Sequence, residues 1–192
     1  MTRTFVALEM NEAVQRHLES VIRQVTQVLP GLRWVDPFGI HITLAFLGEL
    51  TDDELGGVKH AAQAAAQRGT EFSYSLSRIG MFGLSRQPRV IWMGIEEPTG
   101  ALKSLQRHLT QELVRRNFQM DRRPFSPHLT LARIKTPLSP EELQQLQLLL
   151  DGPQQGLLTS ELYPVRHIAV MKSELSLSGA RYTPLQTYAL PE

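Results

Sequence analysis

One short pattern occurs twice in this chain: a histidine, an aliphatic residue, a threonine, a leucine and an alanine. The first copy runs from His41 to Ala45 and the second from His128 to Ala132, so the two histidines are 128 − 41 = 87 residues apart. A single His-x-Thr is unremarkable, because threonine is a good strand residue. Two copies with matching neighbours indicate a pair of related half-sites.

Strand geometry explains the spacing within each copy. Successive side chains of a strand point to opposite faces, so His41 shares a face with Thr43, and His128 with Thr130. The aliphatic residues between them then anchor each strand in a core. We therefore expect a pseudo-twofold arrangement in which two strands present two imidazoles and two hydroxyls to one phosphate.

These groups suit the hydrolysis of a phosphoester. One neutral imidazole can take a proton from water and one imidazolium can protonate the departing oxygen, because histidine titrates near neutral pH. The hydroxyls of Thr43 and Thr130 can donate hydrogen bonds to the non-bridging oxygens as negative charge grows on them. Proton transfer of this kind requires no metal and no cofactor, and we expect neither.

The other four histidines do not suggest a second site. They are placed in amphipathic or alanine-rich helices and in a late strand, and none has a partner at the spacing of a metal-binding helix; they are His17, His60, His108 and His167. The chain contains no cysteine, which excludes disulfides and thiolate metal sites.

Helices and strands alternate irregularly along the sequence. Apolar periodicity and capping residues predict helices over 11–29, 51–67, 99–117 and 139–150, with Asn11, Thr51 and Ser139 as N-caps. Strands are predicted over 4–8, 40–47, 72–79, 89–95, 127–134, 163–171 and 181–188. The glycine- and proline-rich residues 80–88 are expected to form a loop.

Composition and charge bound the class of protein. The chain has 192 residues, of which 42% are hydrophobic and 20% charged, as in a soluble globular protein. Its formal net charge is +1, less than is usual for a protein that binds long nucleic acid by its backbone. Without a signal sequence, a membrane span or a linker, residues 1–192 are expected to form one bilobal α+β domain that is cytoplasmic and monomeric.

The paired signatures resemble those of the 2H phosphoesterase superfamily. Within it, the sequence is most similar to the bacterial and archaeal RNA 2′,3′-cyclic phosphodiesterases, also called 2′-5′ RNA ligases. The likeness extends over nearly the whole chain. It is carried by residues 3–7, Trp34, 41–44, 46–48, 88–92, 125–133, 173–175 and 179–182.

This resemblance implies a fold and a reaction. The fold is two pseudo-symmetric lobes, each an antiparallel sheet with helices packed outside, around a central cleft. The reaction is hydrolysis of a ribonucleoside or RNA 2′,3′-cyclic phosphate to a 2′-phosphate, with His41 as proton donor and His128 as proton acceptor. RNA 3′ ends or nucleotides carrying the cyclic phosphate are the implied partners, and the resemblance implies reversible 2′-5′ ligation as a second activity of the same site.

Two further residues are implied by the resemblance, Phe46 for stacking on a base and Arg133 for binding phosphate. Each lies five positions after its histidine, and on a regular strand an odd offset turns a side chain to the opposite face. Either the strands bulge or twist before these positions, or the two residues are structural.

Two rival functions are compatible with the motifs. One is another 2H activity, such as opening ADP-ribose 1″,2″-cyclic phosphate. The other is an RNA-binding module whose histidines only hold phosphate, against which the modest net charge argues weakly.

Overall fold

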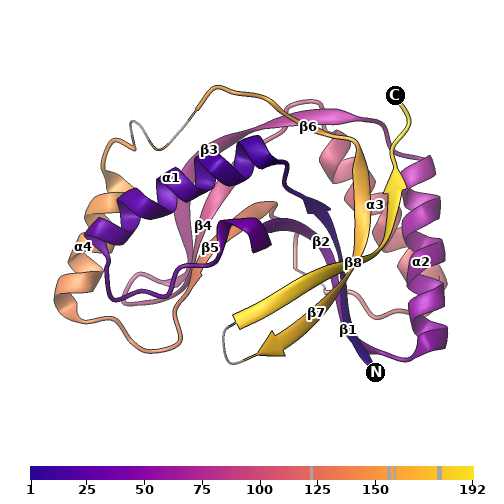
Figure 1. The fold of residues 1–192 in the computed structure, drawn as a ribbon, viewed down its shortest axis with the longest axis horizontal. Coiled ribbons are helices and arrows are strands. Elements are labelled where there is room, and N and C mark those ends of the chain that lie inside the picture. The colour runs from indigo at the N-terminus through magenta and orange to yellow at the C-terminus, as the bar shows by residue number, and fades with distance from the viewer. Residues whose placement is uncertain (122, 155–156, 158, 177–178) are drawn as a thin grey trace.

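The computed structural model describes residues 1–121, 123–154, 157, 159–176 and 179–192 (Figure 1). In this part of the chain there are four α-helices, one short 3-10 helix and eight strands. In chain order they are β1 (Thr2–Glu9), α1 (Glu12–Val28), η1 (Pro37–Gly39), β2 (His41–Leu50), α2 (Asp52–Gln67), β3 (Phe72–Leu84), β4 (Gln87–Glu96), α3 (Ala101–Arg115), β5 (His128–Arg133), α4 (Pro140–Asp151), β6 (Tyr163–Val165), β7 (His167–Ser176) and β8 (Gly179–Ala189).

Three of the helices begin at the capping residues that the sequence predicts. The Asn11 side chain accepts a hydrogen bond from the backbone of Val14 at the start of α1. Thr51 with Glu54, and Ser139 with Glu142, form complete capping boxes at the starts of α2 and α4.

The strands form one curled antiparallel sheet in the order β6-β3-β4-β5-β2-β1-β7-β8. Its two halves meet where Ile42 of β2 pairs with Leu129 of β5. We call β2-β1-β7-β8 the β1 half and β6-β3-β4-β5 the β4 half. Each half has four strands, so the α+β fold with two related lobes is confirmed.

The helices cover the outside of the two halves. Helices α2 and α3 pack together, and α2 lies against the strands of the β1 half. Helices α1 and α4 lie on the other side of the molecule (Figure 1). A single core of buried apolar side chains contains residues from all four helices and from both halves of the sheet.

Two connections differ from the sequence prediction. Residues 80–88 are not a loop, because β3 continues to Leu84 and β4 starts at Gln87. The predicted strand 163–171 is divided at Arg166, where the chain leaves β6, paired with β3, and enters β7, paired with β1. Within the described residues, no helix combines the length and the apolar character needed to span a membrane.

Candidate active site

The two histidines lie at the junction of the two halves. Ile42 and Leu129 pair directly across the junction, and both side chains are fully buried in the core. His41, Thr43, His128 and Thr130 flank this pair and are half-buried. Because side chains alternate along a strand, these four residues lie on the opposite face from the core, which we call the histidine face. The two predicted histidines and the two predicted threonines thus lie on adjoining strands.

Each imidazole is oriented by a carbonyl two residues earlier in the chain. Nδ1 of His41 lies 2.9 Å from the carbonyl oxygen of Gly39, and Nδ1 of His128 lies 2.7 Å from that of Ser126. A carbonyl oxygen can only accept a hydrogen bond, so Nδ1 must carry a proton in both rings. The Nε2 atom of each ring is therefore the one left to exchange protons with a ligand.

Burial and nearby charge affect the proton affinity of both rings. Burial lowers the pKa of His41 and, to a lesser degree, the positive charges of Arg133 and His128 lower it further, against the opposing effect of the hydrogen bond to Gly39. Burial also lowers the pKa of His128, opposed by the hydrogen bond to Ser126 and supported by Arg133. A lowered pKa favours the neutral form of each ring at pH 7.

The strands that carry the histidines are bulged at equivalent positions. In β2, Ala45 and Thr43 pair with consecutive residues of β1, so Leu44 is the extra residue. In β5, Ala132 and Thr130 pair with consecutive residues of β4, so Leu131 is the extra residue. A bulge of this kind places two successive side chains on one side of the strand.

The bulges decide where Phe46 and Arg133 lie. Leu44 and Ala45, like Leu131 and Ala132, are at most 5% exposed, so two neighbouring side chains enter the core. Phe46 and Arg133 follow and are exposed. The alternation is thereby shifted by one, and both side chains return to the histidine face despite their odd offset.

The surroundings of these two side chains are consistent with this position. Arg133 lowers the pKa of both histidines, so its charge acts on both rings. Phe46 is 53% exposed, and the guanidinium carbon of Arg3 lies 4.8 Å from its ring centroid. One face of the Phe46 ring is therefore paired with a cation.

The sequence reasoning missed an aromatic pair beside each histidine. Around His41 the ring centroids of Phe5 and Tyr182 lie at 4.6 and 4.8 Å. The ring centroid of Phe82 lies 4.9 Å from that of His128, with the two planes nearly perpendicular, and 5.3 Å from that of Trp92. The repeat gave no signal for these residues, because Trp92 lies opposite Thr130 while Ala7 occupies the equivalent position opposite Thr43.

Potential metal ligands are not clustered in the part of the chain that the structure describes. No group of three or more histidine, cysteine, aspartate or glutamate side chains lies there in an arrangement that could hold an ion. The histidine face itself carries two imidazoles, two hydroxyls and a guanidinium.

A bilobal α+β fold with one such motif in each half defines a 2H phosphoesterase. The family described as LigT like Phosphoesterase matches twice, over residues 8–92 and 94–179. These matches cover most of the chain, which belongs to this family. Each match contains one histidine motif, and each includes strands from both halves of the sheet.

Curated relatives and solved structures agree with this assignment. An RNA 2′,3′-cyclic phosphodiesterase of Geobacillus stearothermophilus is 33% identical over 74% of this chain, which spans only 46% of that relative. One from Methanothermobacter thermautotrophicus is 27% identical over 98% of both chains. The crystal structure of TT0787 of Thermus thermophilus matches with a TM-score of 0.80 and 27% identity, over 98% of this chain and 97% of the other. E. coli LigT complexed with 3′-AMP matches with a TM-score of 0.74 and 25% identity, over 100% and 99%.

Proposed function

We propose that this protein hydrolyses the 2′,3′-cyclic phosphate of RNA 3′ ends or of nucleotides to a 2′-phosphate. The observation that carries the proposal is the pair of imidazoles on adjoining strands, each with Nδ1 bound to the carbonyl two residues earlier and Nε2 left for proton exchange. The names of the curated relatives support the choice of substrate, and the 3′-AMP complex of E. coli LigT supports a nucleotide ligand.

The reaction balances with the residues of the histidine face. Nε2 of His128 takes a proton from water as the water oxygen bonds to phosphorus. The bond between phosphorus and the 3′ oxygen breaks, and His41, protonated at Nε2, gives its proton to that oxygen. The 2′ ester remains, and exchange with solvent restores both rings. The donor and acceptor roles follow the family resemblance, because the two half-sites are nearly equivalent.

The other groups of the histidine face bind and position the substrate. Thr43 and Thr130 donate hydrogen bonds to the non-bridging oxygens, and Arg133 offsets the charge that grows on them. The exposed ring of Phe46 offers a surface for the terminal base. If a 5′-hydroxyl of another RNA replaces water, the same steps run as a 2′-5′ ligation, which is the secondary activity of the proposal.

We also propose one cooperative domain that acts as a monomer in the cytoplasm. One chain supplies both histidine motifs, so a single copy can carry out the reaction. The continuous core supports a single domain. We expect the protein to meet RNA with cyclic phosphate ends in the cytoplasm.

The test is liquid chromatography with mass spectrometry of the products from nucleoside 2′,3′-cyclic monophosphates in buffer containing EDTA, with authentic 2′- and 3′-monophosphates as standards because the two isomers have the same mass. We expect a 2′-monophosphate, and we expect His41→Ala and His128→Ala each to reduce turnover by about 10²–10⁴-fold, the usual contribution of acid–base catalysis. His60→Ala is the matched control, since His60 is exposed on α2 and should keep normal turnover.

Several outcomes would contradict the proposal. Turnover of ADP-ribose 1″,2″-cyclic phosphate without turnover of the nucleotides would assign a different 2H reaction. Binding of RNA without turnover of any cyclic phosphate would favour the RNA-binding alternative. Loss of activity in EDTA that zinc or magnesium restores would show that the imidazoles do not act alone.

A further inference from the structure

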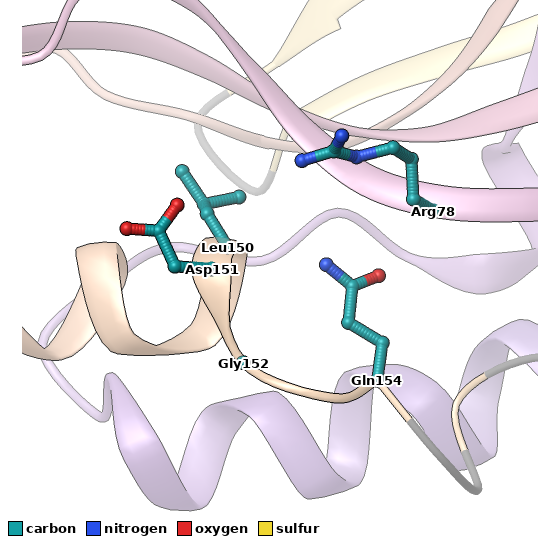
Figure 2. Close-up of a pocket in the computed structure, with 5 residues that line it drawn as sticks. All are labelled: Arg78, Leu150, Asp151, Gly152 and Gln154. Atoms are coloured by element: carbon teal, nitrogen blue, oxygen red, sulfur yellow. The ribbon is translucent and has the colours of Figure 1, made fainter.

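A pocket of about 450 Å³ lies at the outer edge of the β4 half, away from the histidines. Arg78 reaches over it from β3, and Leu150, Asp151 and Gln154 approach from the end of α4 and the segment that follows (Figure 2). A second hollow of about 360 Å³ shares Arg78, Leu150 and Asp151 with the first and is also lined by Trp92. Together they form a depression that runs from α4 towards Trp92.

The backbone at Arg78 departs from regular strand geometry. The pairing of β3 with β4 shifts between Leu76 and Ile79, so Arg78 lies within a bulge. The side chain of Gln154 holds this bulge, since its Oε1 accepts a hydrogen bond from Ile79 N at 2.6 Å and its Nε2 donates to Ile79 O at 3.2 Å. Bulges are a common means of redirecting a side chain near a binding site.

The indole of Trp92 forms the other end of the depression. A Cβ atom at Gly80 would overlap the six-membered part of the ring, and one at Gly94 would lie 3.3 Å from it, so the ring lies flat across these two glycines. Trp92 pairs with Thr130 of β5 and with Gly80 of β3. Its ring is therefore on the histidine face, one strand from Thr130 and His128.

The depression lies within reach of the chain that continues from a bound 3′ end. Strands β5 and β3 are separated by two strand spacings of about 4.8 Å, or roughly 10 Å in all. One or two further nucleotides of an RNA strand can cover this distance.

The side chains of the depression match the groups of an upstream nucleotide. Among the described residues, the guanidinium of Arg78 has neither a hydrogen-bond nor an ion-pair partner, although Asp151 lines the same pocket. The carboxylate of Asp151 accepts a hydrogen bond from Gln147 at 2.6 Å instead. Arg78 can bind a phosphate, Asp151 can accept from a ribose hydroxyl, and the indole can stack on a base.

We propose that this depression binds the nucleotides upstream of the cyclic end, with Arg78 on a backbone phosphate and Trp92 beneath a base. This inference rests on the proposed function and deepens it, because it makes the substrate an RNA strand rather than a free cyclic nucleotide.

The kinetic test compares two substrates with the same terminal nucleoside, a 2′,3′-cyclic mononucleotide and a tetraribonucleotide ending in that cyclic nucleotide. For the unmodified protein, kcat/KM should be higher on the tetranucleotide. Arg78→Gln should reduce the ratio of the two kcat/KM values by about 5- to 20-fold, the effect of losing one charged contact to phosphate. Arg107→Gln is the matched control, because Arg107 is exposed on α3 at the outer surface of the molecule, and it should leave the ratio unchanged.

A binding measurement separates failure of the subsite from failure of the proposed function. The affinity for a labelled oligoribonucleotide with a 2′-phosphate end is measured by fluorescence anisotropy at several salt concentrations. Arg78→Gln should weaken binding and reduce the slope of log affinity against log salt by about 0.7, as one phosphate contact on a single strand is lost. An unchanged ratio together with an unchanged slope overturns the subsite while the proposed function stands. No turnover of either substrate, with the slope still dependent on Arg78, overturns the proposed function and supports an RNA-binding surface at this depression.

Discussion

At the scale of single residues, backbone carbonyls decide which nitrogen of each imidazole is left for proton exchange. Gly39 and Ser126 hold the Nδ1 protons of His41 and His128 at matching offsets. The two rings are thus nearly equivalent, and their roles must differ through the substrate and through neighbours that are not repeated. Arg133 is such a neighbour, since Phe46 occupies the equivalent position in the other half.

The roles of the two histidines can be separated with a substrate whose leaving group needs no proton. We expect a phosphodiester with a nitrophenolate leaving group to restore part of the activity of His41→Ala, because the donor is then dispensable. His128→Ala should not be restored, because water still requires a base. The measurement is the turnover of this phosphodiester and of the 2′,3′-cyclic nucleotide by His41→Ala and by His128→Ala. Restoration of His128→Ala alone would reverse the roles, and restoration of neither would mean that the rings mainly bind phosphate.

Arg133 should also set the pH optimum. Its charge lowers the pKa of both histidines, so Arg133→Gln should raise both pKa values towards the ordinary value of 6.5. A donor works below its pKa and an acceptor above it, so both limbs of the kcat/KM profile should move to higher pH. Arg133→Lys keeps the charge and should keep the optimum. A uniform loss of activity at every pH for Arg133→Gln would limit Arg133 to binding phosphate.

At the scale of elements, the sequence predicts what depends on local rules. The caps of α1, α2 and α4 and the alternation around each histidine follow from neighbouring residues, and all are present. A glycine leads to a wrong prediction of secondary structure where it is required by packing against a distant residue. Gly80 begins the predicted loop, yet it lies within β3 because only a residue without a Cβ leaves room for the Trp92 ring.

The bulges at Leu44 and Leu131 also lie beyond local rules. Whether a strand contains an extra residue depends on its register with the neighbouring strand. That neighbour is β1 for β2 and β4 for β5, and in each case a helix separates the two strands in the sequence. The repeated leucine and alanine were visible in the sequence, but a regular strand would send only one of them into the core. For this reason the position of Arg133 could not be decided before the pairing was known.

Substitution of Ala132 tests the bulge directly. Because the bulge points Ala132 into a filled core, Ala132→Leu should lower the free energy of unfolding by about 1–3 kcal/mol. Urea unfolding provides the measurement, and Ala180→Leu at an exposed position of β8 is the control, expected to change stability by less than about 0.5 kcal/mol. On a regular strand residue 132 would instead face the ligand, so unchanged stability with reduced turnover would contradict the bulge.

At the scale of the whole molecule, the chain passes repeatedly between the two halves. Helix α3 joins two strands of the β4 half but packs on α2 and β2 of the β1 half. At the junction of β1 and α1, Met10 accepts a hydrogen bond from Tyr74 of β3. The repeat in the sequence therefore does not correspond to two separate domains. Each half is completed by segments that belong, in sequence, to the other.

This exchange predicts that the two halves unfold together. Thr51→Ala removes the cap of α2, on the β1 half, and should lower the free energy of unfolding by about 1 kcal/mol. Both tryptophans report on the β4 half, since Trp92 lies in β4 and Trp34 pairs with Ala132 of β5. If the halves are one cooperative unit, the midpoint followed by tryptophan fluorescence should shift as far as the midpoint followed by far-ultraviolet circular dichroism.

Ser139→Ala gives the matched comparison, because it removes the equivalent cap from α4, whose residues Leu150 and Asp151 line the same hollow as Trp92. The two variants should shift both probes alike, and the double variant should show the sum of their effects, since the caps are on different helices with no shared partner. A fluorescence midpoint that responds to Ser139→Ala but not to Thr51→Ala would mean that the β4 half unfolds on its own. In that case the pairing of Ile42 with Leu129 joins two domains, and the relative position of His41 and His128 would depend on how those domains dock.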